Sequence, residues 1–253
     1  MQSKRIIPTF LLKGKRLVKG TNFSNYVDVG DPVSQTKIYD SQGADEIIIC
    51  DIEATKENRI IDTSIISKIT YHSHTPIAVG GGIDNLSKAV AYFEAGADKI
   101  IVNTGSLEDP SLIKDLSSNF GAQSIVVSID VKKDVYGNYI PYSNSGRLEK
   151  KIELGNYIKE IIKFGCGEIM LTSIDKDGTL SGFELELYKK YADKISVPLI
   201  ASGGANCYDD IVDLFRINGI DACGIGKMFF LRNYDIIGIK SYLTGKKINV
   251  RDA

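Results

Sequence analysis

The sequence contains few residues of the types that hold metal ions or form covalent cross-links. Its 253 residues include only two histidines, His72 and His74, and no Cys, Asp or Glu completes a ligand spacing with them. The four cysteines are Cys50, Cys166, Cys207 and Cys223. They show no paired spacing, and three lie in or beside apolar runs, where buried thiols are common. We therefore expect no metal site, no cofactor and a reducing, cytoplasmic location.

The sequence also lacks an excess of either charge and any long apolar run. Its 31 basic and 32 acidic residues leave a net charge of −1, which implies no broad attraction to nucleic acid or to membranes. No apolar run approaches the roughly 20 residues of a membrane span, and no signal peptide pattern opens the sequence. With 43% hydrophobic residues and no credible linker, we expect one domain, residues 1–253, with a large core.

One short pattern occurs twice. Residues 76–83 read PIAVGGGI, and residues 198–205, which lie 122 positions later, read PLIASGGA. Each copy is an apolar run that ends in glycines, and it predicts a buried strand followed by a helix. Glycine lets backbone N–H groups approach an anion closely, and a helix N-terminus adds positive potential. One copy alone would favour a turn that binds nothing, whereas two copies at one offset indicate a duplicated half-barrel with two anion cradles.

The alternation of strands and helices predicts the fold. We expect parallel strands at residues 6–12, 46–51, 77–79, 99–103, 124–130, 168–173, 198–201 and 222–225. Helices are expected to begin near Asp31 and Asp109 and to cover residues 154–164 and 236–243, and two longer segments are expected as a lid (13–31) and a small hairpin (131–147). The chain length of 253 is close to the roughly 250 residues of a (β/α)8 barrel. The sequence therefore predicts a single α/β TIM barrel of two similar half-barrels, roughly residues 1–122 and 123–253.

In such barrels the chemistry lies at the carboxyl ends of the strands. Asp130 closes a buried strand there, and it is a candidate general acid–base if burial raises its pKa. An ion pair with Lys132 or a helix cap is an equally good interpretation from spacing alone. Asp175 and Asp177 flank Lys176 before a glycine, a pattern that favours a turn or helix cap for at least one of them.

Along nearly its whole length the chain resembles the cyclase subunit of imidazole glycerol phosphate synthase. The matching segments are residues 5–8 (RIIP), 18–20 (VKG), 30–32 (GDP), 43–46 (GADE), 80–83 (GGGI), 95–99 (AGADK), 103–104 (NT), 171–173 (LTS), 175–179 (DKDGT) and 201–205 (ASGGA). Together these segments are specific, because they separate the chain from most other barrels. The resemblance implies a TIM barrel that receives ammonia from a glutaminase subunit docked on the amino-terminal face.

The resemblance also assigns roles to particular residues. The family's charged gate maps onto Arg5, Glu46, Lys99 and Glu168, with Asp98 at the glutaminase contact, although four charges at strand starts could equally be a structural salt-bridge ring. The family's substrate is a phosphorylated small molecule. Its substrate and phosphate contacts map onto Lys19, Gly82, Asn103, Thr104, Asp177, Gly178, Gly203, Gly204, Gly226 and Lys227.

The sequence departs from the family at the substrate end. The family uses two catalytic aspartates, of which the second matches Asp130, while the first falls at Leu11. Leucine transfers no proton, and losing one of two such groups costs on the order of 10²–10⁴-fold in rate. Lys227 stands where the family has a small hydroxyl residue, and the family's His-Gly-Gly-Arg run reads NSGR at residues 144–147.

Three functional hypotheses follow. Leu11 favours a paralogous group from surface-glycan (lipopolysaccharide) gene clusters, in which the barrel relays ammonia from a glutaminase to an N-acetyl-sugar amidotransferase that makes an acetamidino sugar. The second hypothesis is a genuine cyclase of histidine biosynthesis, which makes imidazole glycerol phosphate and AICAR. The third is a scaffold without activity that only activates the glutaminase.

Overall fold

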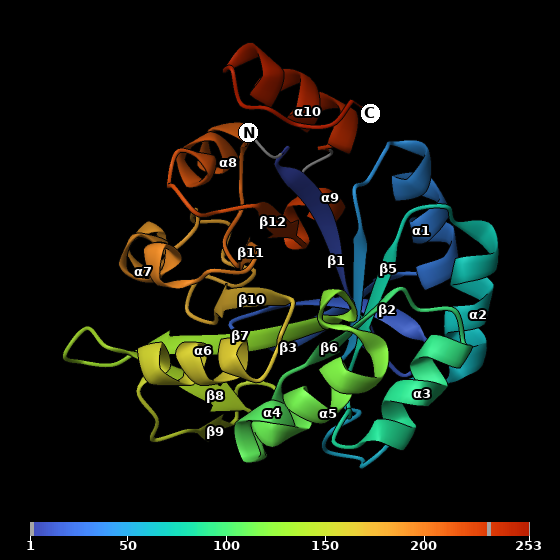
Figure 1. Cartoon of the computed structure of the whole chain (residues 1–253). Coiled ribbons are helices and arrows are strands. Elements are labelled where there is room, and N and C mark those ends of the chain that lie inside the picture. The colour runs from blue at the N-terminus through green and yellow to red at the C-terminus, as the bar shows by residue number, and fades with distance from the viewer. Residues whose placement is uncertain (1–2, 232–233, 253) are drawn as a thin grey trace.

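Eight parallel strands close into a barrel in the computed structural model, which describes residues 3–231 and 234–252 (Figure 1). They are β1 (Arg5–Lys13), β4 (Ile47–Asp51), β5 (Ile77–Gly80), β6 (Lys99–Val102), β7 (Ile125–Lys133), β10 (Glu168–Ser173), β11 (Leu199–Ser202) and β12 (Ala222–Ile225). Each strand pairs in parallel with the next, and β12 pairs with β1. The predicted TIM barrel is therefore confirmed, and its division into two half-barrels stays a prediction.

Helices follow the strands and cover the outside of the barrel. They are α1 (Pro32–Ser41), α2 (Thr63–His72), α3 (Leu86–Glu94), α4 (Thr104–Glu108), α5 (Ser111–Phe120), α6 (Leu154–Lys163), α7 (Leu185–Tyr191), α8 (Tyr208–Phe215), α9 (Lys227–Leu231) and α10 (Ile236–Gly245). The helix expected near Asp31 begins at Pro32, and the Asp31 side chain caps it by accepting a hydrogen bond from the Ser34 N–H. The helix predicted near Asp109 begins at Ser111, and the short α4 precedes it. None of the helices in the described residues is long and apolar enough to span a membrane.

Two antiparallel extensions lengthen the sheet. The predicted lid segment forms β2 (Arg16–Thr21) and β3 (Ser24–Gly30), which pair with each other, and β2 also pairs with β1. The predicted small hairpin is confirmed, since β8 (Tyr139–Ser143) pairs with β7, and β8 pairs in turn with β9 (Leu148–Glu149). Both extensions continue from the carboxyl ends of barrel strands.

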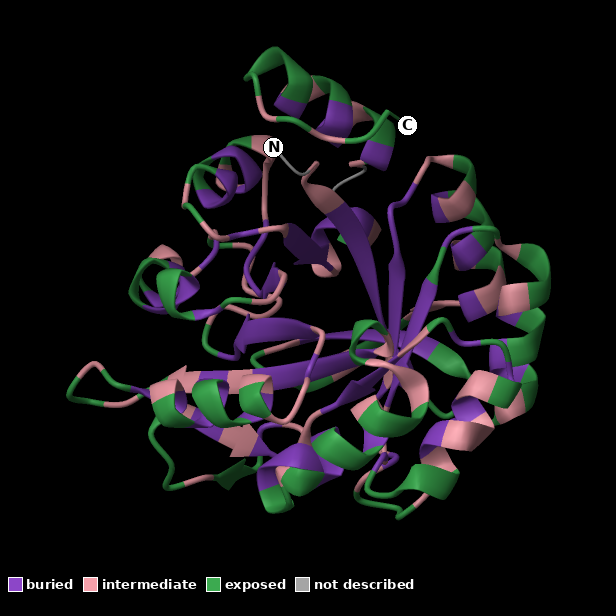
Figure 2. Cartoon of the chain, viewed as in Figure 1, coloured by how far each residue is buried: buried purple, intermediate pink, exposed green. Residues whose placement is uncertain are grey.

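The buried residues form two separate layers. The larger core lies between the strands and the helices, so each helix buries one face and exposes the other (Figure 2). A second cluster fills the inside of the barrel with one side chain from each parallel strand, and we call it the inner layer. Its members are Ile7, Ile48, Ala78, Ile101, Val126, Met170, Ile200 and Ala222. Because both faces of the strands are covered, the strands read as continuous apolar runs.

Candidate active site

A pocket opens at the carboxyl ends of the barrel strands, on the face where the sequence predicted the chemistry. Its wall contains Leu11, Lys19, Gly82, Asn103, Thr104, Asp130, Asp177, Gly178, Gly226 and Lys227. Gly203 and Gly204 line a smaller recess that shares Asp177 and Lys227 with the pocket. The pocket also reaches Ile48, Ile101 and Met170 of the inner layer. The structure therefore brings all the predicted catalytic and ligand-binding positions to one place, while their roles stay predictions.

Asp130 lies half-buried in the pocket wall near the end of β7. The Asn103 side-chain amide donates to one of its carboxyl oxygens at 3.2 Å, and the Ser128 hydroxyl donates to the other at 3.5 Å. Burial raises the pKa of Asp130 to about 7, and the nearby Asp177 carboxylate contributes in the same direction. A group with this pKa can donate or accept a proton at neutral pH.

The competing interpretation of Asp130, an ion pair with Lys132, is not what the structure has. The Lys132 ammonium lies over the Tyr142 ring, 4.6 Å from its centroid, and donates to the Gly146 carbonyl at 3.3 Å. Strand alternation places Asp130 and Lys132 on the same face of β7, so alternation alone does not separate them. The pairing of β7 with β8 brings Tyr142 opposite Asp130, and the Tyr142 ring takes up the Lys132 ammonium. Asp130 is left to the pocket.

Leu11 makes the neighbouring part of the wall apolar. It is half-buried on β1, opposite Cys50 of β4 and Val18 of β2 in the strand register. Asp51 follows Cys50 and also lines the pocket, but its carboxylate is paired with Arg59 at 2.6 Å. Because its carboxylate is held in this ion pair, Asp51 does not supply the free carboxylate that is missing at position 11.

The first glycine cradle needs glycine for steric reasons. Gly82 has φ +73°, and a Cβ there would lie 1.9 Å from the Arg59 carbonyl oxygen. Asn103 and Thr104 stand opposite at the start of α4, where the Thr104 hydroxyl lies 3.2 Å from the Asn103 side-chain oxygen. The Asn144 N–H donates to the same hydroxyl at 2.9 Å. The turn after β8 thus closes over this cradle.

The second cradle has the same backbone requirement and an added cation. Gly204 has φ +107°, and a Cβ there would lie 2.2 Å from the Gly182 carbonyl oxygen. The Lys227 ammonium donates to the Thr21 hydroxyl at 2.6 Å and to the Gly178 carbonyl at 2.8 Å. Through these two hydrogen bonds, Lys227 connects the turn at Gly178, beside this cradle, to the end of β2.

Lys19 is a buried cation beside the second cradle. Its ammonium donates to the Thr9 carbonyl and lies 5.2 Å from the centroid of the Phe230 ring. Burial lowers the pKa of Lys19 to about 8, while the Asp177 carboxylate acts in the opposite direction. Lys19 and Lys227 together give this half of the pocket its positive charge.

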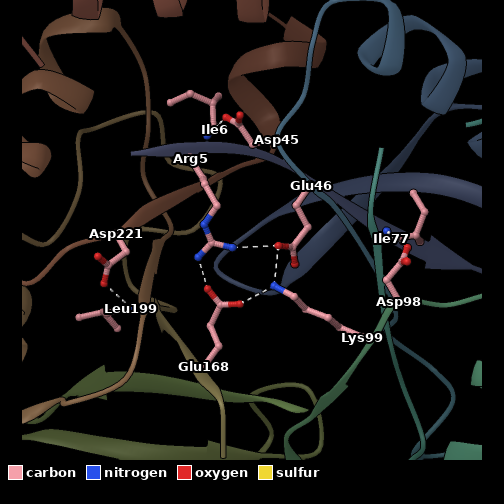
Figure 3. Close-up of polar contacts among 10 residues, drawn as sticks. All are labelled: Arg5, Ile6, Asp45, Glu46, Ile77, Asp98, Lys99, Glu168, Leu199 and Asp221. Carbon is pink, nitrogen blue, oxygen red and sulfur yellow. Dashed lines mark hydrogen bonds and ion pairs between the residues drawn. The ribbon is translucent and has the colours of Figure 1, made fainter. Parts of the chain in front are cut away.

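Four charged side chains form a closed ring at the amino-terminal end of the barrel (Figure 3). Arg5 contacts Glu46 at 2.9 Å and also pairs with Glu168, while Lys99 lies 2.8 Å from a carboxylate oxygen of each glutamate. Both glutamates are buried, and burial raises the pKa of Glu46, against the effect of Lys99. The salt-bridge ring is therefore present, and its role as an ammonia gate stays a prediction.

Asp98 has a structural contact close to the ring. Its carboxylate accepts a hydrogen bond at 2.8 Å from the Ile77 N–H at the start of β5 (Figure 3). Two other aspartates do the same near the starts of β1 and β11, Asp45 for Ile6 at 2.8 Å and Asp221 for Leu199 at 3.0 Å. These bonds satisfy strand-end amides that lack a ladder partner. Contact of Asp98 with a glutaminase stays a prediction.

The sequence interpretation missed several residues that line the pocket. Phe23 and Tyr26 come from the β2–β3 hairpin, and burial raises the pKa of Tyr26 to about 12. Ser145 comes from the turn after β8 and donates to the Ile52 carbonyl at 2.9 Å. The only signal for them was the unusual length of the two segments after the first and fifth parallel strands.

Comparison with known proteins agrees with this geometry. The family described as "Histidine biosynthesis protein" matches residues 5–235. The chain is similar to imidazole glycerol phosphate synthase subunit HisF of Clostridium botulinum (strain Alaska E43 / Type E3), with 42% identity over 253 residues that cover 99% of this chain and 100% of the relative. The corresponding subunits of Clostridium beijerinckii and Cytophaga hutchinsonii are 41% and 40% identical, with the same coverage.

These relatives bear on the three functional hypotheses. Their names favour the second hypothesis, the histidine-pathway cyclase, over the first. They give no support to sugar amidination, to an acetamidino-sugar paralog or to an amidotransferase partner. The chain belongs to the histidine biosynthesis protein family, within its group of HisF subunits of imidazole glycerol phosphate synthase.

Proposed function

We propose that this chain is a cyclase-type synthase subunit that incorporates ammonia into a phosphorylated, sugar-bearing nucleotide and forms imidazole glycerol phosphate. The observation that carries the proposal is the position of Asp130. It lies in a pocket that reaches the inner layer of the barrel, with a pKa of about 7. A proton donor and acceptor at that place suits the addition of ammonia to a carbonyl carbon.

A glutaminase subunit is the proposed source of the ammonia. The relatives are named as subunits of a synthase, which implies a partner for them. We propose that the partner docks over Arg5, Glu46, Asp98, Lys99 and Glu168, where the charged ring closes the end of the barrel opposite the pocket. These four paired side chains would have to separate before ammonia enters the barrel. Binding of the glutaminase on this face would separate them, so the path would open only in the complex.

The two glycine cradles are the proposed sites for the ligand's phosphate groups. Gly82 and Thr104 offer backbone and hydroxyl donors on one side of the pocket, and Gly204 lies in the recess on the other side. A ligand with a phosphate at each end would place its middle beside Asp130. Lys19 and Lys227 add charge only on the second side, so we expect the two ends to bind with different salt dependence.

An ammonium-driven steady-state assay tests the proposal without a partner. We expect measurable formation of imidazole glycerol phosphate by the wild-type chain, and a loss on the order of 10²–10⁴-fold for Asp130→Asn. Asp84→Asn, which removes an exposed surface carboxylate paired with Lys88, is the matched control and should leave the rate unchanged. No detectable product from the wild type under saturating ammonia would refute the proposal.

Leu11 favours a second candidate, in which the barrel relays ammonia without turning over a ligand of its own. The acceptor would then be a further enzyme, such as an N-acetyl-sugar amidotransferase. The two candidates differ in one measurement. With a glutaminase present, a relay would stimulate glutamine hydrolysis and release free ammonia, whereas a cyclase would couple each hydrolysed glutamine to one molecule of product.

A further inference from the structure

Asp177 presents a carboxyl group that its surroundings leave available. It lies in the turn after β10, where its N–H donates to the Ser173 carbonyl at 2.9 Å and its carbonyl accepts from the Asn22 N–H at 2.8 Å. These bonds fix the backbone on both sides of the side chain. Across residues 3–231 and 234–252, no hydrogen bond or ion pair engages the carboxyl group itself, which lines the pocket. The Asp177 carboxyl group is therefore free to exchange a proton with a ligand in the pocket.

Two ammonium groups lie near Asp177, and each is engaged elsewhere. Lys19 donates to the Thr9 carbonyl, and Lys227 donates to the Thr21 hydroxyl. Both favour the ionised form of Asp177 through space, although burial has the larger and opposite effect and raises its pKa to about 6. At neutral pH the carboxyl group is thus mainly ionised, which is the form of a general base.

Asp130 supplies the complementary group. It lies on β7, the strand that pairs with β10, and lines the same pocket. Burial raises the pKa of Asp130, and the Asp177 carboxylate raises it further, so Asp130 is the group that favours keeping its proton. Asp177 lies near the Lys19 and Lys227 ammonium groups, which favour its ionised form. We propose that Asp177 is the second proton-transfer group of this chain, working with Asp130 in place of the carboxylate that Leu11 does not provide. This inference rests on the proposed cyclase function.

The proton balance of one ammonia addition illustrates the roles. The nitrogen lone pair forms a C–N bond with a carbonyl carbon, and the π electron pair of the carbonyl moves onto its oxygen. Asp130 in its acid form donates a proton to that oxygen, and the Asp177 carboxylate takes one proton from the nitrogen. The product is a neutral carbinolamine, with Asp130 ionised and Asp177 protonated. In the next step, loss of water, Asp177 donates its proton to the departing hydroxyl group while the Asp130 carboxylate takes a proton from the nitrogen, so a C=N bond forms, water leaves and both groups are restored.

The pair predicts a pH profile, which depends on every charged or titratable group that faces it. These are Lys19 on β2, Lys227 on α9, Tyr26 on β3, and Cys50 and Asp51 on β4, of which Asp51 is held in its ion pair with Arg59. Lys19 stays mainly protonated and Cys50 and Tyr26 stay neutral between pH 6 and 7, because the pKa of Lys19 is about 8 and those of Cys50 and Tyr26 are about 12. We expect kcat at saturating free ammonia to fall below about pH 6 and above about pH 7.

Asp177→Asn tests the proposal with little change in shape. We expect kcat to fall by about 10²–10⁴-fold while KM for the nucleotide changes little, and the acidic limb of the pH profile to disappear. Asp175→Asn is the matched control, because this aspartate lies in the same turn and its carboxylate accepts a hydrogen bond from the Lys133 N–H at 2.8 Å, with no other partner among the residues that the structure describes. It should keep wild-type kcat and both limbs.

A rescue experiment separates catalysis from folding. If Asp177 performs the task of the carboxylate missing at position 11, the double variant Leu11→Asp, Asp177→Asn should have a kcat at least tenfold above that of Asp177→Asn alone. The double variant Leu11→Asn, Asp177→Asn should show no such gain. If Asp177→Asn keeps half of the wild-type kcat, or if Leu11→Asp does not rescue it, then Asp177 is not the second proton-transfer group. Either result leaves the cyclase proposal itself standing. A wild-type chain without turnover overturns the cyclase proposal itself and the role of Asp177 with it, so the two failures are distinguishable.

Discussion

Lys227 at the start of α9 donates a 2.6 Å hydrogen bond to the hydroxyl of Thr21 at the end of β2, and so connects the last barrel unit to the first hairpin. The same ammonium donates to the Gly178 carbonyl. A phosphate in the second cradle would compete for this ammonium, because a charged acceptor binds it more strongly than a neutral one.

We therefore expect Lys227→Met to loosen the β2–β3 hairpin. Without the two hydrogen bonds, amide hydrogen exchange in residues 16–30 should accelerate, and binding of inorganic phosphate should weaken about tenfold, which corresponds to the loss of one charge-assisted bond. Exchange mass spectrometry and calorimetry measure the two effects. Lys246→Met, which removes an ammonium over the Tyr242 ring far along the chain, is the control and should change neither.

Lys99→Met should destabilise the amino-terminal end of the barrel. It leaves Glu46 and Glu168, both buried, with Arg5 as their remaining cation in the ring. We expect a loss of about 2 kcal/mol in the free energy of unfolding, measured with urea, since hydrogen bonds to buried charges are worth this much. Lys189→Met breaks an exposed pair with Glu186 and should cost less than about 0.5 kcal/mol. Equal effects of the two variants would contradict the assignment.

Gly82→Ala should damage the first cradle more than a substitution at an equally strained glycine elsewhere. A Cβ at Gly82 would lie 1.9 Å from the Arg59 carbonyl oxygen, so the backbone must move. Gly14 has a similar φ of +60°, and nothing lies within 4 Å of a Cβ built there. Gly14→Ala should therefore lower the free energy of unfolding by about 1–2 kcal/mol, the cost of a left-handed backbone for alanine. Thermal unfolding and phosphate titration of both variants check this, and equal phosphate affinities would count against a site at Gly82.

Leu11→Asp should raise the rate of the ammonium-driven reaction. The new carboxyl group would share the pocket with Asp130 and add a proton acceptor, so we expect kcat to rise about tenfold or more. Leu11→Asn has nearly the same shape but does not titrate, and it should give no gain. A gain of the same size from the asparagine variant would show that space, and not proton transfer, limits the wild-type chain.

Much of the fold follows directly from local sequence. The apolar runs of the barrel strands, the glycine turns at Gly82 and Gly204, and the helix start near Asp31 are properties of a few adjacent residues, and the structure has them where they were expected. The expected strand 99–103 ends at Val102, because Asn103 already turns the chain into α4. That helix was too short for a periodic signal.

The contribution of the β2–β3 hairpin to the pocket could not be predicted in the same way. Phe23 lines the pocket because hydrogen bonds anchor the tip of the β2–β3 hairpin. The Asn22 side chain donates to the Ile174 and Asp175 carbonyls at 3.0 and 2.8 Å. Contacts between residues about 150 positions apart leave no local pattern. The position of Lys132 over Tyr142 likewise depends on the pairing register of two strands, which spacing along one strand does not reveal.

The inner layer has a consequence for the form in which nitrogen would cross the barrel on the proposed ammonia route. Eight apolar side chains separate the charged ring from the pocket, and an ammonium ion would have to give up its hydration there at a cost of many kcal/mol. On the proposed route, nitrogen would therefore cross as neutral ammonia and leave its proton at the entrance. The pocket would then receive a nucleophile without an accompanying acid, so every proton that the proposed reaction consumes there would have to come from side chains already in the pocket.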